Sequence, residues 1–396
     1  MIKKLISICL LFFLVLSCNE EPKITDMQSD FQLKVFGGSS VGSLANDCCN
    51  AVLVDNDNFY LTGSINYLNG PDMFIIKTDK YGNEIEWSPK LYGTQGTEVG
   101  NSIALGADKS VVAAGYTQAQ GAESSDFYVV KTGSNGEEIW KKRFGGSKEE
   151  KAFAVKITPQ NSIYVAGYSE SMIVDKKRQG WVLEISANGD SLWSHDYGIM
   201  NAPDELRGIT EMRDSLLFIG TTQTLFGSFS NDVFLFILKK STKGIENSTT
   251  LYRAGNETGI SAVFSTSGNL YVLGNSQVSS NVNNIILWKL NENLQIIKEK
   301  VITATSSETA SAIAYRNGSV VVTGTAVNEL MNENFLAYVL DEDLNIVSRN
   351  TYGTKGKGNQ RGMSGAIQGN SLLIGGCTIS GNSSKASIFK TPPLLP

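Results

Sequence analysis

The sequence contains one histidine, His195, among 396 residues. A Ser-His-Asp or Cys-His site needs histidine as its base, so the chain can hold at most one such site. His195 lies between Trp193 and Tyr197, in a segment that we expect to form the outermost strand of a sheet. A catalytic histidine belongs near a central site, and we therefore predict a structural or solvent-facing role for His195.

Cysteine is scarce as well, with five in total. Cys9 and Cys18 belong to the N-terminal segment, which leaves Cys48, Cys49 and Cys377. No metal-ligand spacing accompanies these three, and we predict no metal site. Three free buried thiols are the expectation. The alternatives are a bridge from Cys377 to Cys48 or Cys49, or a vicinal bridge between Cys48 and Cys49.

Apolar runs long enough to span a membrane are missing after the N-terminus. There, Lys3 and Lys4 precede an apolar run over residues 5–16, the order found in an export signal. At ~1.5 Å per residue this run reaches only ~18 Å, too short for a bilayer core of ~30 Å. We therefore predict a signal peptide over residues 1–17.

The segment Leu14-Val15-Leu16-Ser17-Cys18 resembles the lipobox of bacterial lipoproteins. The resemblance implies that Cys18 carries acyl chains such as palmitate, and that residues 18–29 form a polar tether between a membrane and a domain over residues 30–396. The acidic pair Glu20 and Glu21 resembles surface-export signals of Bacteroidetes lipoproteins. It implies an outer-membrane location, at the cell surface or the periplasmic face.

An excess of positive charge is also absent. The formal net charge of the full chain is -5, and removing residues 1–17 takes away two lysines and no acids, which leaves 32 basic and 39 acidic residues, or -7. This balance argues against a nucleic acid partner.

A repeat runs through the rest of the chain. Seven segments share a Ser or Asn, three strand-forming apolar residues, one variable residue and a glycine. These repeat glycines are 50 to 54 residues apart: Gly63, Gly115, Gly167, Gly220, Gly274, Gly324 and Gly376. Each period contains four strand-like runs, with hairpin signals such as Asn135-Gly136 between them. Four strands per repeat of about 50 residues predict an all-β fold, a seven-bladed β-propeller with four-stranded antiparallel blades.

The two ends of the repeat array complement each other. The last repeat ends after its third strand, while residues 31–37 form an isolated run like a fourth strand. We predict that this N-terminal strand completes the C-terminal blade and closes the ring, which removes an exposed sheet edge. A right-handed β-solenoid is the alternative, but it would not leave complementary half-repeats at the termini.

Gly136-EEI-Trp140 and Gly189-DSL-Trp193 resemble the strand-d motif of quinoprotein-like propellers. The resemblance implies the fold and an outer-envelope scaffold. The Ala, Asp and Thr positions of that motif are absent, so it does not imply a quinone, and we predict no cofactor.

Acidic residues recur just before the first strand of a repeat. We expect them on one face around the channel mouth, as a solvated rim; the alternatives are glycoside hydrolysis by paired acids or Ca²⁺ binding. They are Asp47, Glu98, Glu149, Glu150, Asp204, Glu205, Glu257 and Glu308.

The loops between the second and third strands vary most in length and sequence. Variable polar loops on a rigid scaffold are common binding sites. We therefore predict a binding face that includes Tyr67, Tyr116, Tyr168, Lys176, Lys177, Arg178, Phe226 and Phe229. The sequence favours a monomeric, non-enzymatic, membrane-tethered module that binds a protein or a glycan. The alternative is a polysaccharide-acting enzyme that uses acids at the channel mouth.

Overall fold

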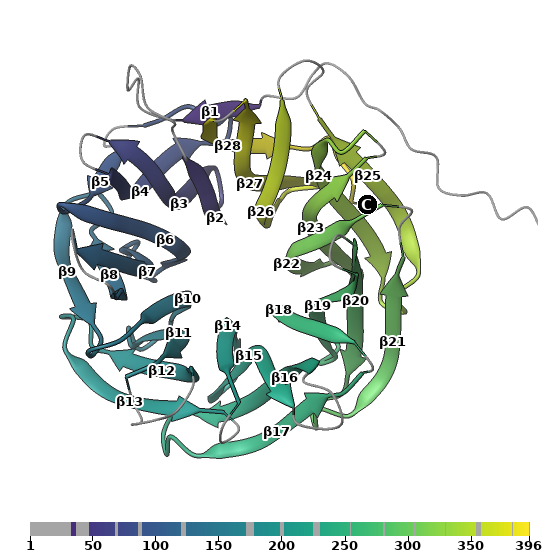
Figure 1. The fold of residues 1–396 in the computed structure, drawn as a ribbon, viewed down its shortest axis with the longest axis horizontal. Coiled ribbons are helices and arrows are strands. Elements are labelled where there is room, and N and C mark those ends of the chain that lie inside the picture. Colours follow the sequence, from purple (N-terminus) through teal and green to yellow (C-terminus); the bar gives the residue numbers. More distant parts are fainter. Residues whose placement is uncertain are drawn as a thin grey trace, which may run out of the picture.

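Short runs of β-branched and aromatic residues, separated by tight turns, form 28 strands in the computed structural model of the protein. They assemble into seven four-stranded sheets arranged as blades around a central axis (Figure 1). The structure describes residues 33–36, 47–67, 70–85, 89–119, 124–171, 178–198, 202–224, 230–253, 255–279, 282–303, 306–328, 330–353, 358–381 and 383–395.

The strands of a blade are named a to d from the channel outward, and the blades are numbered 1 to 7. In that order the a strands are β2 (Cys48–Asp55), β6 (Gly96–Leu105), β10 (Glu150–Ile157), β14 (Asp204–Met212), β18 (Asn256–Phe264), β22 (Glu308–Arg316) and β26 (Asn359–Gln368). The b strands are β3 (Asn58–Tyr67), β7 (Val111–Ala119), β11 (Ile163–Ser169), β15 (Ser215–Thr224), β19 (Leu270–Ser279), β23 (Ser319–Val327) and β27 (Ser371–Ser380). The c strands are β4 (Gly70–Asp79), β8 (Asp126–Thr132), β12 (Gln179–Ile185), β16 (Ser230–Lys239), β20 (Val282–Leu290), β24 (Glu333–Asp341) and β28 (Ser383–Lys390). The d strands are β5 (Lys90–Tyr92), β9 (Glu138–Phe144), β13 (Ser191–Tyr197), β17 (Ile245–Leu251), β21 (Ile296–Ile302), β25 (Ile346–Tyr352) and, in blade 7, β1 (Lys34–Phe36).

The predicted seven-bladed, four-stranded antiparallel propeller is confirmed, and the solenoid alternative is excluded. The predicted closure is confirmed too. β1 pairs antiparallel with β28, with Lys34 opposite Ile388 and Phe36 opposite Ala386. Because strand d of blade 7 comes from the N-terminus, the two ends of the described chain are fastened into one sheet.

The two ends of the channel differ in their connections. The ab and cd connections lie at one end, called here the turn face, and all of them except the cd connection of blade 1 are tight. At Asn317-Gly318, for example, both residues have positive φ, 48° and 80°, as a type I′ hairpin turn requires. The bc and da connections lie at the opposite end, called here the loop face.

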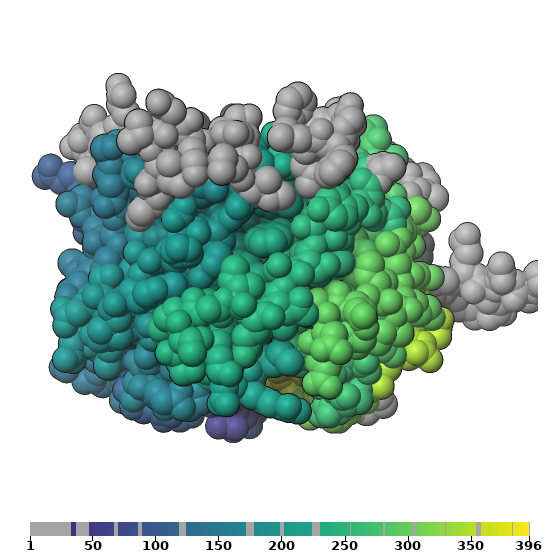
Figure 2. Space-filling model, turned by 90° about the horizontal axis from the view of Figure 1, so that it is seen from below, coloured from purple at the N-terminus to yellow at the C-terminus, as the bar shows by residue number. Residues whose placement is uncertain are grey.

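The core is divided among the blade interfaces. Each of the seven buried apolar clusters combines residues of two neighbouring blades. One joins Phe36, Phe59 and Leu373 across the closure between blades 1 and 7. Figure 2 shows consecutive blades side by side around the wall of the ring. Among the described residues no helix is long and apolar enough to cross a membrane.

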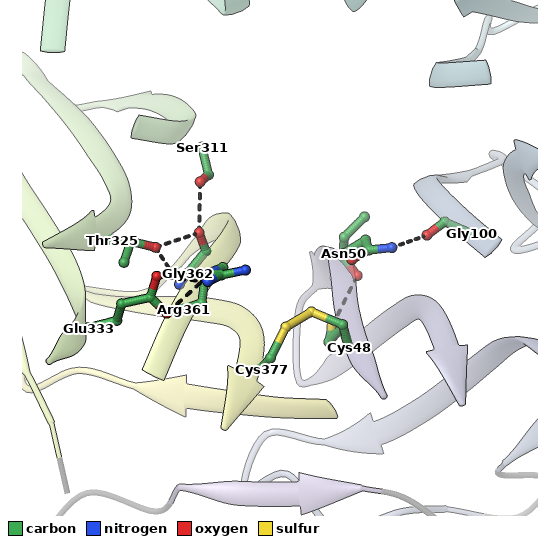
Figure 3. Close-up of a disulfide and its surroundings, with 11 residues drawn as sticks. Cys48, Asn50, Gly100, Ser311, Thr325, Glu333, Arg361, Gly362 and Cys377 are labelled. Carbon is green, nitrogen blue, oxygen red and sulfur yellow. Dashed lines mark hydrogen bonds and ion pairs between the residues drawn. A yellow bond between two sulfur atoms is a disulfide. The ribbon is translucent and has the colours of Figure 1, made fainter. Parts of the chain in front are cut away.

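A disulfide also joins the first and last blades. It links Cys48 on β2 to Cys377 on β27, with their Cα atoms 4.8 Å apart (Figure 3). The expectation of three free thiols is therefore wrong for these two, because ring closure brings together residues 329 apart in sequence. Cys49 remains a free, buried thiol.

Candidate binding site at the channel mouth

Every a strand contains one register shift at the same place. Such a β-bulge leaves one extra residue unpaired and redirects its side chain. The extra residues are Asn50, Asn101, Phe153, Arg207, Ile260, Ser311 and Met363. All seven, called here the bulge ring, line a single cavity of about 750 Å³. The blades therefore each contribute one side chain to a common site.

The repeat glycine accounts for the bulge. It pairs with the residue just before the bulged one, as Gly115 does with Gly100. A Cβ added to Gly115 would lie 1.8 Å from the carbonyl oxygen of Val99, and one added to Gly63 would lie 1.8 Å from that of Cys48. No side chain fits beneath this carbonyl. The glycine that defines the repeat in the sequence thus marks the place where strand a bulges toward the channel.

Neutral polar residues make up half of the residues that line the cavity. Besides the bulge ring, the amide and hydroxyl side chains that line it are Thr258, Asn275, Asn283, Ser307, Thr309 and Thr325. Among the described residues, the charged side chains that line it are Arg207, Arg361 and Glu333. Arg361 Nη2 lies 2.8 Å from Glu333 Oε1 (Figure 3). Arg207 Nε lies 2.6 Å from Glu205 Oε1. With both arginines paired, the cavity suits a ligand without a large net charge.

Several ring side chains are held by the neighbouring blade. Asn50 Nδ2 donates to the carbonyl of Gly100 at 2.9 Å, and Ser311 Oγ donates to that of Gly362 at 2.7 Å (Figure 3). Asn101 donates in the same way to a carbonyl of blade 3, at 2.8 Å. These bonds fix the side-chain orientations before any ligand binds, which lowers the entropic cost of binding.

Blades 3 and 4 form a stacked wall beside the cavity. The Arg207 guanidinium lies 4.7 Å from the ring centre of Phe153, and Arg178 lies 3.9 Å from that of Tyr168. The Phe153 and Tyr168 rings are 5.8 Å apart. Glu205 accepts hydrogen bonds from Arg207 at 2.6 Å and from Arg178 at 3.3 Å. This wall gives the cavity a flat aromatic and guanidinium surface.

Blade 2 extends the same cluster. Lys151 Nζ lies 2.6 Å from Glu149 Oε1 and 4.9 Å from the ring centre of Tyr116. The Tyr168 hydroxyl donates to Glu149 as well. Burial opposes ionisation of Glu149, but the hydrogen bonds from Lys151 and Tyr168 outweigh it and lower the pKa of this carboxyl. Glu149 is therefore a carboxylate that orients its two neighbours.

The structure brings three of the predicted binding residues into this cluster. Tyr116 and Arg178 are half-buried, whereas Tyr168 is only 2% exposed and supports the wall from behind. Tyr67 ends β3, but its side chain is not among those described. Outside the described residues lie the predicted lipidation site and the other predicted contacts: Cys18, Lys176, Lys177, Phe226 and Phe229.

The acids expected as a solvated rim require a correction. One per blade is buried: Asp47, Glu98, Glu150, Asp204, Glu257 and Glu308, with Gln360 in the same place in blade 7. Each lies three residues before the bulged residue, where alternation along strand a turns the side chain away from the channel. These six acids are not at the channel mouth, so the paired-acid and Ca²⁺ alternatives keep only Glu149 and Glu205 of the acids on which they were based.

The buried acids instead fasten the connections between blades. Glu98 accepts hydrogen bonds from the Thr94 amide at 2.9 Å and from the Thr117 hydroxyl at 2.6 Å. Glu150 accepts from the Gly146 amide at 2.8 Å. Glu98 and Glu150 thus each tie the da connection to strand b of their own blade. Glu308 instead accepts from Tyr338 of strand c at 2.8 Å. Glu149 and Glu205 are the half-buried exceptions, and both are paired with cations.

His195 lies on β13, in the outermost layer of blade 3, and is exposed. Its ring contacts those of Trp193 and Tyr197, with centres 6.0 and 4.9 Å apart. The predicted position away from the channel is confirmed.

Sequence reasoning missed the bulge ring. In six of the seven a strands the bulged residue stands between two small residues, as in Gly100-Asn101-Ser102 and Ala152-Phe153-Ala154. This pattern is visible in the sequence, but it does not by itself show that the central residue is left unpaired between strands a and b.

The sequence matches no family model and no curated protein. Solved structures, in contrast, share the fold. YCF48 bound to D1 peptide has a TM-score of 0.53 and 11% identity, and the match covers 93% of this chain and 96% of that one. A protein of unknown function from Dyadobacter fermentans has a TM-score of 0.51 and 12% identity, over 73% of this chain and 93% of that one.

Two further neighbours are enzymes solved in complex with arabinobiose. The GH93 α-L-arabinofuranosidase of Fusarium graminearum, in complex with arabinobiose, has a TM-score of 0.51 and 10% identity, over 73% of this chain and 91% of that one. The α-L-arabinanase of Penicillium chrysogenum has a TM-score of 0.51 and 8% identity, over 73% of this chain and 92% of that one. At these identities the likeness shows the fold alone.

The prediction that the chain is not an enzyme is corrected by these neighbours. It was based on the lack of a recognisable catalytic constellation, but propellers of this shape include glycosidases. The fold therefore does not settle whether this protein is an enzyme.

Proposed function

We propose that this chain is a membrane-anchored, extracytoplasmic propeller that binds a short, uncharged oligosaccharide at its channel mouth. One observation carries the proposal: the bulge ring and its neighbours surround a cavity of about 750 Å³ with amide, hydroxyl and aromatic groups and balanced charges. Cavities of roughly 300–1,000 Å³ with a few fixed polar groups are typical of small-ligand sites.

The chemistry of the lining favours a sugar over an ionic ligand. Asn101 and Asn283 line the cavity with amide groups, which can both donate and accept, as sugar hydroxyls require. Phe153 offers a ring face on which the apolar face of a pyranose or furanose can stack. The arginine–glutamate pairs leave little uncompensated charge to attract an anion.

Anchoring is part of the same proposal. The lipobox-like segment ending at Cys18 supports acylation of this cysteine and retention at the outer membrane, on the surface or the periplasmic side. Cys18→Ser should abolish incorporation of labelled palmitate and release the protein from the membrane fraction. Unchanged labelling would count against Cys18 as the acylated residue.

The binding proposal is tested with glycan arrays, followed by calorimetry on the best ligand and analysis for released products. Phe153→Ala and Asn101→Ala should each weaken binding at least tenfold, because each removes a stacking or hydrogen-bonding group from the cavity. Ile139→Ala on the exposed surface of β9 is the matched control and should leave binding unchanged. Product release would show that the site is catalytic as well.

Failure of every glycan to bind would contradict the proposal. So would a ligand whose affinity is unchanged by both channel substitutions but lost on shortening the bc loops of blades 3 and 4. That second outcome would instead indicate recognition of a protein by the outer loops.

A further inference from the structure

The described chain begins at the turn face, opposite the channel mouth. β28 is a c strand and runs from the loop face to the turn face, and β1 is antiparallel to it. Leu33, the first described residue, therefore lies at the turn-face end of blade 7. Only residues 19–32 separate it from Cys18. If residues 19–32 act as the polar tether that the sequence predicts, their length corresponds to about 20 Å on average, and an anchor at Cys18 would keep the turn face near the bilayer.

A cavity of about 430 Å³ opens beside this point, between blades 7 and 1. Phe59, Leu373 and Ile388 give it apolar walls. Lys34, Lys80 and Lys390 also line it, and its described lining includes no carboxylate. An acid-free cluster of three lysines stands out in a chain whose net charge is -5.

The closure of the ring explains why this cavity exists. Between blades 2 and 3, Trp140 of β9 packs against Gly189 in the cd turn of the next blade and donates to the Ala187 carbonyl at 2.9 Å. β1 has only three residues, Lys34–Phe36, and no described residue takes the place of Trp140 at the closure. At the closure, the Lys34 side chain therefore lies next to the turn glycine, Gly82.

The acids that interact with these lysines lie outside the cavity lining: Asp79 near Lys34 and Asp57 near Lys80. Lys34 Nζ donates to the Asn83 side chain at 3.2 Å. Lys80 lies 3.7 Å from Asp57, whose side chain is 74% exposed. Tyr81, 58% exposed, adds an aromatic ring at the rim. Cationic groups around an apolar hollow, with an aromatic ring at the edge, match the phosphate, acyl and interfacial layers of a bilayer surface.

We propose that this cavity binds the phosphate headgroup and upper acyl chain of an anionic phospholipid. The turn face then lies against the membrane and the channel mouth points away from it. The orientation rests on the proposed anchoring at Cys18, but lipid binding by the cavity does not. The bound lipid would add a second membrane contact to the acyl chains, and durable attachment generally needs two.

The test uses the mature chain with Cys18→Ser, so that no acyl chain contributes. Binding is measured by co-sedimentation with vesicles of phosphatidylcholine alone and with vesicles containing phosphatidylglycerol. We expect binding to the anionic vesicles only. Lys34→Gln, Lys80→Gln and Lys390→Gln combined should reduce it at least tenfold, because each lysine near an anionic surface strengthens attachment severalfold.

The matched control carries the same charge change on the outer wall, at Lys141, Lys142 and Lys298. It should keep most of the binding. Equal losses in both triple variants, or no binding to anionic vesicles, would overturn the proposal. Glycan binding by the cavity variant should be unchanged, so failure here is distinguishable from failure of the proposed function. Thermal unfolding of each variant checks that the fold is retained.

Discussion

The repeat glycines show how one residue type determines the shape of the site. At Gly115, the nearest atoms to an added Cβ are the Val99 carbonyl oxygen at 1.8 Å and carbon at 2.8 Å, with the Asn101 amide nitrogen at 3.1 Å. These are backbone atoms of the bulge, and they cannot move away as a flexible side chain could. Glycine is therefore required for packing, not for a positive φ.

Gly115→Ala should consequently lower the free energy of unfolding by about 2–4 kcal/mol, the range for substitutions that force a packed backbone apart. Gly244→Ala is the control, because only the Thr242 hydroxyl, at 3.5 Å, lies near its added Cβ. That variant should unfold within about 0.5 kcal/mol of the wild type. Urea denaturation of both proteins measures the difference, and equal stabilities would contradict this account of the bulge.

A second feature at the residue scale is a pair of neighbouring acids, Asp72 on β4 of blade 1 and Glu98 on β6 of blade 2. Burial, and then the charge of nearby Glu98, raise the pKa of Asp72 to about 6. The folded protein therefore keeps a proton that the unfolded chain has already released between pH 4 and pH 6. The contribution of Asp72 to stability is present at pH 4 and is lost as the pH rises through 6.

Asp72→Asn should remove this loss of stability at rising pH, because asparagine does not ionise. Asparagine is tolerated at this position of strand c, since Asn284 and Asn334 occupy it in blades 5 and 6. We expect the variant to be more stable than the wild type at pH 7 by about 1 kcal/mol, allowing for solvent screening, and equally stable near pH 4. Thermal unfolding at both pH values measures the effect. Asp190→Asn, at an exposed turn, should show no such pH-dependent gain.

At the scale of elements, the closing strand β1 and strand β5 of blade 1 are the two shortest d strands. β1 contributes three paired residues, whereas the complete d strands, such as β9, have seven. The disulfide from Cys48 to Cys377 reinforces the same seam from the channel side, between β2 and β27. The two contacts hold opposite edges of the interface between blades 1 and 7.

Removing the disulfide with Cys48→Ala and Cys377→Ala should cost about 2–5 kcal/mol of unfolding free energy, because the bond restricts a long loop of the unfolded chain. Reductant should lower the melting temperature of the wild type toward that of the double variant and leave the variant unchanged. Cys49→Ala, without reductant, is the control for loss of a buried thiol. A wild-type melting temperature that does not change with reductant would contradict the presence of the disulfide.

At the scale of the molecule, the residues that repeat in the blades hold the fold, and the bulge ring, which varies, lines the candidate site. Buried acids and repeat glycines recur from blade to blade and hold the connections and the bulges. The bulge ring changes from blade to blade, from Asn50 to Phe153 to Met363. A single propeller can therefore change its ligand by substitution at seven positions without disturbing the frame.

The sequence by itself determined the number of blades, the strand order and the closure. These follow from a repeat of hydrophobic pattern and turn residues that is local to each segment of about 50 residues, and from half-repeats at the two ends. It also indicated the loop face, where Tyr116 and Arg178 lie. It did not identify the channel-lining residues, and it misassigned Cys48, Cys377 and the acids at the start of each a strand.

Only the tertiary structure decided those points, and the reason is the same in each case. Alternation predicts which side of a strand a residue occupies, but one extra residue in the ladder reverses it, and the bulge becomes visible only when strands a and b are paired. That pairing turns Glu98 inward and Asn101 toward the channel. The half-repeats already made blades 1 and 7 neighbours and left a bridge from Cys377 to Cys48 as an alternative to free thiols. Only the folded ring decided for it, because it places the two Cα atoms 4.8 Å apart.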